Sequence, residues 1–249
     1  MEKSTLSDNR QQLVVKSNDL IQRTRYDLSL QEQKIVLYVI SKIKPTDEEL
    51  QEYSFTMREL CEMCGIEAIG QNFENMWQSI VALNEKTIEF EDNRYRGNPR
   101  WIEMPIMDKL TKEIRIRFHP LLRPYLIALH ENFTQYELSS ILIMRSRYSV
   151  RMYELLKSYA YLDEITFSLE ELKKKLQTTG YSDYKNFRVR VLEKAIEEIN
   201  EHTDIRVEFK PIRTSRVITH LRFIIERKSS AEQVMLRAKR NAALDAKES

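Results

Sequence analysis

Glycine and proline are scarce in this sequence, which has 4 Gly and 6 Pro among 249 residues. Collagen-like chains and flexible linkers need far more of both. A backbone loop that cradles phosphate also needs several closely spaced glycines, and neither the P-loop nor the dinucleotide pattern is present. The scarcity therefore argues against a nucleotide-binding enzyme built on such loops. The four glycines are Gly65, Gly70, Gly97 and Gly180.

Cysteines and long apolar runs are also few. Cys61 and Cys64 are the only cysteines, too few for a disulfide scaffold and typical of a reducing compartment. Their C-x-x-C spacing has no second pair and no zinc-spaced histidine, so we interpret both as helix residues that pack in a core. No run approaches the roughly 20 apolar residues that span a bilayer. The polar segment 1–10 lacks the apolar stretch of a signal peptide. We expect a cytoplasmic protein without a membrane partner.

Catalytic patterns are missing as well. The four histidines stand alone and form no His-x-His pair, which a metal-dependent rolling-circle nickase would need; they are His119, His130, His202 and His220. His220-Leu221-Arg222 has the wrong spacing for a tyrosine recombinase and lies in an expected strand. The sequence predicts no enzyme, no metal site and no cofactor.

Charge is distributed unevenly along the chain. Residues 1–139 carry 18 basic and 22 acidic side chains, whereas residues 140–228 carry 18 and 13. A basic half suggests a polyanionic partner for that half, although ordinary scatter could give the same difference. The charge pattern favours a polyanionic partner for the C-terminal half, and the helix and wing described below make double-stranded DNA the expected one.

The chain contains a degenerate internal repeat. Phe55-Thr56-Met57-Arg58-Glu59-Leu60 is similar to Phe167-Ser168-Leu169-Glu170-Glu171-Leu172, and each predicts a strand that ends at a capping box. The segments 37–42 and 152–157 are also alike, and Asn-Phe opens a helical pattern at 72 and again at 186. Alternating strands are expected at 86–91, 101–107 and 113–118, then at 205–210 and 217–225.

Each half therefore follows the order of a winged helix, a helix-turn-helix followed by a β-hairpin wing. We predict an α+β fold of two tandem winged-helix domains at 11–125 and 131–228, with two unrelated α+β domains as the alternative. Pro120 and Pro124 mark the join, and the apolar segment 125–129 predicts a packed connecting helix. The tail 229–249 is expected to form a short helix or to be disordered.

The best candidate for DNA recognition is the helix over 184–200, capped by Ser182 or Asp183. Its core arc is expected to hold Phe187, Val191, Leu192, Ala195 and Ile199. The opposite arc presents Asn186, Val189 and Arg190, whose side chains suit base edges in a major groove. Lys185 and Lys194 are better suited to phosphates. Arg188 falls near the core arc, so its role is ambiguous. A solvated helix face is the alternative.

Further basic residues extend this candidate interface. Lys210, Arg213 and Arg216 surround the turn of the second wing, where arginines suit phosphates or a minor groove. Arg145 and Arg147 precede a helix expected at 148–160 and suit backbone phosphates, although loop arginines are often only solvated.

The matching helix of the first half is polar without being basic. Gln71, Asn72, Asn75 and Gln78 are its candidate DNA contacts, while Phe73, Trp77, Ile80 and Val81 form its expected core arc. We expect this domain to assist DNA binding and to carry self-association. Its strand region offers sheet edge and apolar residues for a dimer, namely Trp101, Ile102 and Met104. Alternatively, these residues complete the domain core.

Several ordered segments together resemble the iteron-binding replication initiators of theta-replicating bacterial plasmids, the RepB-like Rep proteins. The resemblance covers about residues 11–228 and rests on four stretches: 15–21 (VKSNDLI), 28–34 (LSLQEQK), 148–156 (YSVRMYELL) and 199–205 (INEHTDI). It implies tandem winged-helix domains that bind directly repeated iterons, a monomer for initiation and a dimer that represses its own gene. It also implies dimerisation through the first domain and contacts with the host initiator and replicative helicase.

Two other functions stay open at this point. A tandem winged-helix transcriptional regulator would need the same DNA-binding surface without opening an origin. A nickase or recombinase is disfavoured by the missing histidine pair. Directly repeated sites beside an AT-rich segment would favour the initiator, and a lone palindrome would favour the regulator.

Overall fold

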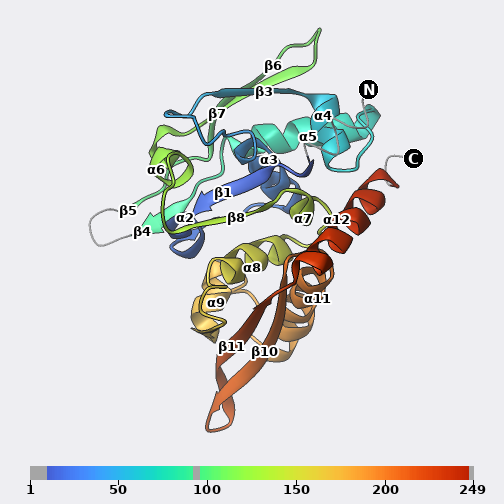
Figure 1. Ribbon diagram of the computed structural model, residues 1–249. Helices are drawn as coiled ribbons and strands as arrows, with labels where there is room; N and C mark the ends of the chain where they lie inside the picture. Colours follow the sequence, from blue (N-terminus) through green and yellow to red (C-terminus); the bar gives the residue numbers. More distant parts are fainter. Residues whose placement is uncertain (1–9, 92–95, 247–249) are drawn as a thin grey trace. The chain divides into compact units, whose positions relative to one another are not determined.

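The computed structural model describes residues 10–91 and 96–246, and the chain divides into two compact units. Unit 1 comprises Met1–Ile143 and Lys239–Ser249, and unit 2 comprises Met144–Ala238. Figure 1 shows helices packed beside small antiparallel sheets within each unit. This is the α+β class expected from the sequence.

Unit 1 contains three small sheets and several short helices. In chain order its elements are β1 (Leu13–Ser17), α2 (Asn18–Gln22), β2 (Thr24–Arg25), α3 (Leu30–Ile40), β3 (Glu52–Thr56), α4 (Met57–Met63), α5 (Gly70–Leu83), β4 (Glu89–Glu91), β5 (Arg96–Gly97), β6 (Ile102–Met107), β7 (Glu113–Phe118), the 3-10 helix η1 (Pro120–Leu122), α6 (Arg123–Leu126), β8 (Phe133–Glu137) and α7 (Ser139–Leu142).

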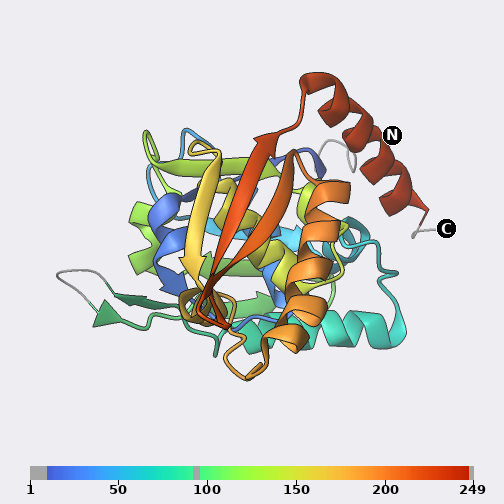
Figure 2. The ribbon, with the colours of Figure 1, turned by 90° about the horizontal axis from the view of Figure 1, so that it is seen from below.

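Unit 2 has the simpler order of one winged helix. Its elements are α8 (Arg147–Lys157), β9 (Glu164–Ser168), α9 (Leu169–Lys175), α10 (Tyr184–Phe187), the π-helix η2 (Arg188–Leu192), α11 (Glu193–His202), β10 (Ile205–Thr214) and β11 (Val217–Arg227), followed by α12 (Ser230–Asp245). Figure 2 shows α11 beside the long hairpin of β10 and β11.

The two units share one sheet topology, which confirms the internal repeat. In unit 1 the strand before the helix pair, β3, pairs with β7, and β7 pairs with β6. In unit 2 the equivalent strand β9 pairs with β11, and β11 pairs with β10. Phe55 lies opposite Ile114, and Phe167 lies opposite Leu221, so the two repeated phenylalanines occupy matching places. Each unit is thus a helix-turn-helix followed by a hairpin wing (Figure 1).

The repeated helices α4 and α9 each form one of the two hydrogen bonds of the expected capping box. Thr56 accepts a hydrogen bond from the Glu59 N–H at 3.1 Å, and Ser168 accepts one from the Glu171 N–H at 3.1 Å. The glutamate side chains turn elsewhere: Glu59 accepts from Tyr38 and Lys42. Complete reciprocal capping boxes lie instead at Ser29 and Glu32, at the start of α3, and at Ser229 and Glu232, at the start of α12.

The boundary between the units lies later than the expected join at 125–131. Strand β8 pairs antiparallel with β1, with Gln135 opposite Val15, so the segment up to Ile143 belongs to unit 1. The connector is also less helical than expected, because α6 ends at Leu126 and Ala128 turns the chain with a φ of 52°. Pairing over more than 110 residues leaves no local signal, which is why the pattern of the sequence placed the join too early.

The tail forms a helix, one of the two expected outcomes. Helix α12 starts in unit 2, and from Lys239 its residues group with unit 1. There Leu244 is fully buried and the Arg240 guanidinium donates to Glu137 Oε2 at 2.5 Å and to Ser139 Oγ at 3.1 Å. The end of α12 is therefore part of the packed structure of unit 1.

The expected strands and core residues lie close to their predicted positions, with some differences. The strand at 86–91 shortens to β4, preceded by an isolated bridge between Thr87 and Arg100. The second wing is longer than expected, because β10 extends to Thr214 and β11 extends to Arg227. Cys61 and Cys64 form no disulfide and are buried, which confirms them as core residues.

Candidate nucleic-acid interface

The recognition helix of unit 2 buries the arc that its sequence predicts. Its five expected core residues are at most 1% exposed: Phe187, Val191, Leu192, Ala195 and Ile199. Asp183 caps the helix by accepting from the Asn186 N–H at 3.0 Å, which selects Asp183 over Ser182 as the cap. The buried arc fixes the helix against the core, and the opposite arc is left facing solvent.

The helix is not a regular α-helix throughout. Residues Arg188–Leu192 form a π turn, in which the Glu193 N–H bonds the Arg188 carbonyl five residues back. The wider turn rotates Arg188 away from the core, so it is exposed and its Nε donates to Glu193 Oε1 at 2.7 Å. The expectation that Arg188 lies near the core arc was therefore wrong, because it assumed 3.6 residues per turn at every position.

The exposed arc presents the side chains proposed for DNA contact. Lys185, Asn186, Val189, Arg190 and Lys194 are all exposed, and Val189 keeps 47% of its surface in contact with solvent. An arginine, an asparagine and a small apolar side chain are suited to guanine, adenine and the thymine methyl group. The arrangement is chemically able to contact base edges, and the flanking lysines can contact phosphates.

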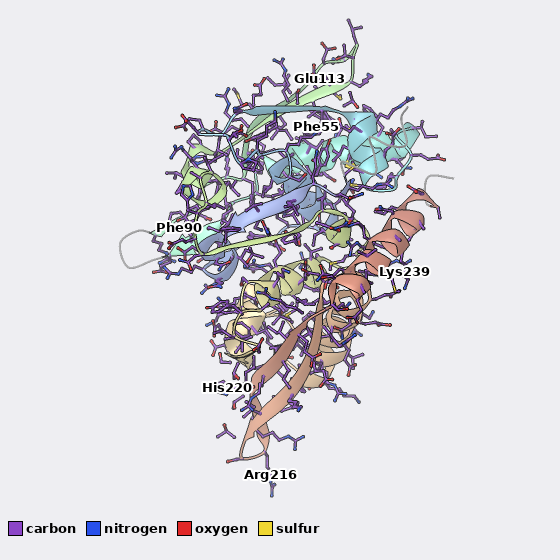
Figure 3. All side chains as sticks on the ribbon, viewed as in Figure 1. Phe55, Phe90, Glu113, Arg216, His220 and Lys239 are labelled. Carbon is purple, nitrogen blue, oxygen red and sulfur yellow. The ribbon has the colours of Figure 1, made fainter. Side chains whose placement is uncertain are left out.

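The wing of unit 2 carries the second basic group. Strands β10 and β11 are joined by Ser215 and Arg216, and Ser215 takes a φ of 58° at this tight turn. Figure 3 shows Arg216 at the tip of the hairpin, with its side chain pointing away from the sheet. Lys210, Arg213 and Arg216 are exposed. A narrow basic hairpin of this kind can reach phosphates or a minor groove.

Sequence reasoning did not name Arg222, a further basic residue of this sheet. Arg222 is exposed on β11, between Lys210 on β10 and Thr166 on β9. Its neighbours Leu221 and Phe223 are buried, so strand alternation alone places Arg222 on the outer face. That signal was present in the sequence.

Arg145 and Arg147 lie at the start of α8. The Arg145 N–H donates to Glu198 Oε1 at 2.9 Å, while the side chain is exposed. Arg147 belongs to the helix itself, and its guanidinium lies 5.0 Å from the centre of the Tyr148 ring. Arg145 is thus available to a phosphate, whereas Arg147 is half-buried and stacked on an aromatic ring.

The matching helix of unit 1, α5, exposes the four polar residues named from the sequence. Gln71, Asn72, Asn75 and Gln78 all face solvent, and Gln71 donates to Asn75 at 2.9 Å. The core arc differs from the expectation: Met76, Ile80 and Leu83 are buried, Phe73 and Trp77 are half-buried, and Val81 is 39% exposed. Met76, Ile80 and Leu83 follow an i, i+4, i+7 spacing, so they share one face of the helix and form its buried stripe. Val81 follows Ile80 directly and therefore lies off this face.

The apolar residues proposed for self-association separate into two groups. Trp101 and Ile102 are 1% exposed and complete the core of unit 1, where the Trp101 ring meets Tyr26 edge-on at 5.1 Å between centroids. Met104 is 76% exposed, and Leu110 at the tip of the same hairpin is 93% exposed. Trp101 and Ile102 therefore cannot form a surface, whereas Met104 and Leu110 expose apolar area on the outer part of the hairpin.

Charges of the recognition helix and of the wing both act on Tyr184, the first residue of α10. The Tyr184 hydroxyl is buried and makes no hydrogen bond with a described residue. Burial raises the pKa of the Tyr184 phenol, and the charges of Arg188, Glu193 and Arg213 act on it in turn. Tyr184 is thus within electrostatic range of both basic groups, through Arg188 on the helix and Arg213 on the wing.

Other chemistries find no support in the part of the chain that the structure describes. Within residues 10–91 and 96–246, no three His, Cys, Asp or Glu side chains gather as a metal site. None of the described helices combines the length and apolar character that crossing a membrane requires.

Comparison with known proteins adds independent support for the fold. Residues 13–157 match the family described as "Initiator Replication protein, WH1", and residues 168–225 match "Initiator Rep protein, WH2". A replication initiation protein of Escherichia coli is 24% identical over 205 residues, which cover 78% of this chain and 64% of that protein. This chain thus corresponds to somewhat under two thirds of the length of that relative.

A solved structure is also similar. The crystal structure of the Pi initiator protein in complex with iteron DNA has a TM-score of 0.71 and 20% sequence identity to this chain, and it covers 89% of this chain and 99% of the Pi chain. At this identity the likeness supports the fold, with its two winged-helix domains. Since the two domain matches together cover most of the chain in the expected order, the chain belongs to the family of initiator replication proteins built from WH1 and WH2 domains.

Proposed function

We propose that this protein is a sequence-specific DNA-binding initiator of plasmid replication that binds directly repeated iterons at an origin. The observation that carries the proposal is the exposed arc of the recognition helix, with Asn186 and Arg190 beside a basic hairpin of the same unit. Membership of the initiator family supports it. The proposal contains no chemical step and requires no cofactor.

Unit 2 is the main DNA-binding unit in this proposal. The helix from Tyr184 to His202 enters a major groove, where Asn186, Val189 and Arg190 contact base edges. Phosphates are contacted by exposed lysines and arginines around these residues, which position the protein without specifying sequence. These contacts are proposed for Lys185, Lys194, Lys210, Arg213, Arg216, Arg145 and Arg147, and Arg188 is proposed to contact the DNA from the same arc.

Unit 1 has a different role in the proposal. Its helix α5 presents Gln71, Asn72, Asn75 and Gln78, which can make auxiliary base contacts, but none of them supplies the positive charge that dominates affinity for DNA. We assign self-association to this unit. A monomer binds each direct repeat, whereas a two-fold dimer presents two recognition helices to an inverted operator and represses the gene. Recruitment of the host initiator and the replicative helicase completes initiation, which takes place in the cytoplasm with the plasmid.

The test uses the DNA that flanks the gene. Footprinting with the purified chain should protect several directly repeated sites of the same sequence, next to an AT-rich segment. A small plasmid with this DNA as its only origin should then replicate in a bacterial host only when the protein is supplied. The double variant Asn186→Ala/Arg190→Ala should lose both the footprint and replication.

The outcomes separate the initiator from a transcriptional regulator. Protection of a single palindrome, with no replication of the test plasmid, would favour the regulator and overturn the proposal. Cleavage of supercoiled origin DNA by the purified protein with a divalent metal would indicate a nickase instead.

A further inference from the structure

The pair formed by Arg188 and Glu193 distinguishes one arginine of the recognition helix from the other cations there. The Arg188 Nε donates to Glu193 Oε1 at 2.7 Å, and the two side chains are 53% and 41% exposed. In the described part of the chain, Lys185, Arg190 and Lys194 make no ion pair, although Glu197 lies exposed on the same helix. One carboxylate is thus directed at one arginine in the middle of the exposed arc.

The π turn creates this pair. In a regular α-helix, residues five apart point about 140° away from each other and do not meet. Residues Arg188–Leu192 instead form a π turn, in which the i to i+5 spacing places residue 188 and residue 193 on the same side. The irregular turn therefore brings these two side chains together, and π turns of this kind often occur at functional sites.

The geometry of the contact leaves part of the arginine available. Glu193 accepts from Nε, which is one of the five donors of the guanidinium. The two terminal nitrogens are the ones that bind guanine O6 and N7 side by side. A carboxylate bonded to Nε fixes the plane of the guanidinium and offsets its positive charge. It also weakens the attraction of Arg188 to phosphate, because the negative charges of Glu193 and of the DNA backbone repel each other.

The surroundings support a fixed position. The buried hydroxyl of Tyr184 lies one helical turn before Arg188, and the charges of Arg188, Glu193 and the wing residue Arg213 all act on its phenol. Val191 and Leu192, inside the π turn, are buried in the core. The pair therefore belongs to a part of the helix that is packed against the core, and the charge of the wing residue Arg213 acts on the same part.

We propose that Glu193 is a specificity-determining residue: it orients Arg188 toward a base and prevents this arginine from contributing to binding at random sequence. This inference rests on the proposed function, because it assumes that the recognition helix of unit 2 lies in a major groove. It assigns to Arg188 a base contact in place of the phosphate contact expected from its charge alone.

The experiment compares two isosteric variants of the full-length protein, Glu193→Gln and Glu197→Gln. Both remove one negative charge from the exposed side of the same helix, but only the first removes the ion-pair partner of an arginine. Binding is measured to a duplex selected from a random pool by the wild-type protein and to a random-sequence duplex, over a series of salt concentrations. We expect Glu193→Gln to lower the ratio of the two affinities by about tenfold and to steepen the salt dependence on random DNA by about 0.9, the value of one phosphate contact. Glu197→Gln should keep the ratio within about twofold, since it frees no cation.

Changes at Arg188 provide the second readout. Arg188→Lys should lose preference at one base position while it keeps affinity for random DNA, because lysine has no fork of donors. In an Arg188→Ala background, Glu193→Gln should act no more strongly than Glu197→Gln. Equal effects of the two glutamate variants in the wild-type background, or unchanged base preference in Arg188→Lys, would overturn the inference. If the wild-type protein itself does not distinguish selected from random DNA, the proposed function fails instead.

Discussion

The Tyr38 hydroxyl donates a hydrogen bond of 2.6 Å to Glu59 Oε1, which ties helix α3 to helix α4. Lys42, one turn after Tyr38, donates to the same oxygen at 2.9 Å and lies 4.7 Å from the centre of the Tyr38 ring. Unit 2 repeats this arrangement: Tyr153 donates to Asp204 Oδ1 at 2.9 Å, and Lys157 pairs with Asp204 Oδ2. The repeated Tyr-x-x-x-Lys spacing thus holds one carboxylate in each unit.

We predict that Glu59→Gln destabilises unit 1 by about 1–2 kcal/mol, because hydrogen bonds to a charged acceptor contribute more than those to a neutral amide. Unfolding of the full-length protein in urea, followed by circular dichroism, measures the loss. Glu67→Gln is the matched control, since Glu67 is exposed and has no ion pair or hydrogen bond among the described residues. Equal unfolding midpoints for the two variants would contradict a structural role for Glu59.

The base contacts proposed for the recognition helix give a second prediction. Arg190→Ala and Asn186→Ala should each weaken binding to the selected duplex by about 1–3 kcal/mol and relax preference at one base position. Both side chains are exposed near the start of the helix. Affinities for a set of single-base variants of the duplex provide the measurement. Wild-type affinity and footprint in the double variant would show that this arc does not contact bases.

The wing should act on affinity without acting on sequence. Replacing Arg213 and Arg216 with Ala removes two exposed charges from the hairpin and should weaken binding to all duplexes alike. Each lost phosphate contact should flatten the slope of log K against log salt concentration by about 0.9. A changed base preference with an unchanged slope would mean that the wing contacts bases in a groove.

Much of the fold could be predicted because the relevant signals are local. The repeated Phe-Thr and Phe-Ser segments mark strand ends and helix caps, and the spacing from Phe187 to Ile199 marks a buried stripe. These patterns are local, because a helix cap or a buried helix face involves residues only a few positions apart. They were sufficient to predict both winged helices in their correct order.

The errors come from features that depend on distant residues or on irregular backbone. The pairing of β8 with β1 and the hydrogen bonds from Arg240 to Glu137 and Ser139 join residues more than 100 positions apart. The π turn at Arg188 interrupts a sequence that a uniform helix would fit equally well, so the orientation of Arg188 could not be derived from a fixed 100° rotation per residue.

Self-association should depend on the outer part of the β6–β7 hairpin. Met104→Glu combined with Leu110→Glu places charges on two of the most exposed apolar side chains of unit 1, so the dimer fraction at tens of micromolar protein should fall. Sedimentation equilibrium of the full-length chain measures it. Val234→Glu is the control, because Val234 is 64% exposed on α12 in unit 2. A larger effect of Val234→Glu would move the self-association surface away from unit 1.

Cys61 gives a prediction for pH dependence. Burial raises the pKa of its thiol from 9.0 to about 12, and the neighbouring Cys64 and Glu62 act in the same direction. Because the folded-state pKa lies above the unfolded value, the stabilisation is complete below pH 9 and is lost as pH rises toward 12. In a Cys64→Ala variant, which leaves Cys61 as the single thiol, iodoacetamide at pH 8.5 should label the native protein at least about 100-fold more slowly than the urea-unfolded chain, since only the thiolate reacts.

Urea titrations from pH 8 to 11 should show a smaller loss of unfolding free energy in Cys61→Val than in the parent, because valine has no proton to release. Equal labelling rates in the folded and unfolded states, or identical pH profiles for the two proteins, would show that Cys61 is not held in its protonated form.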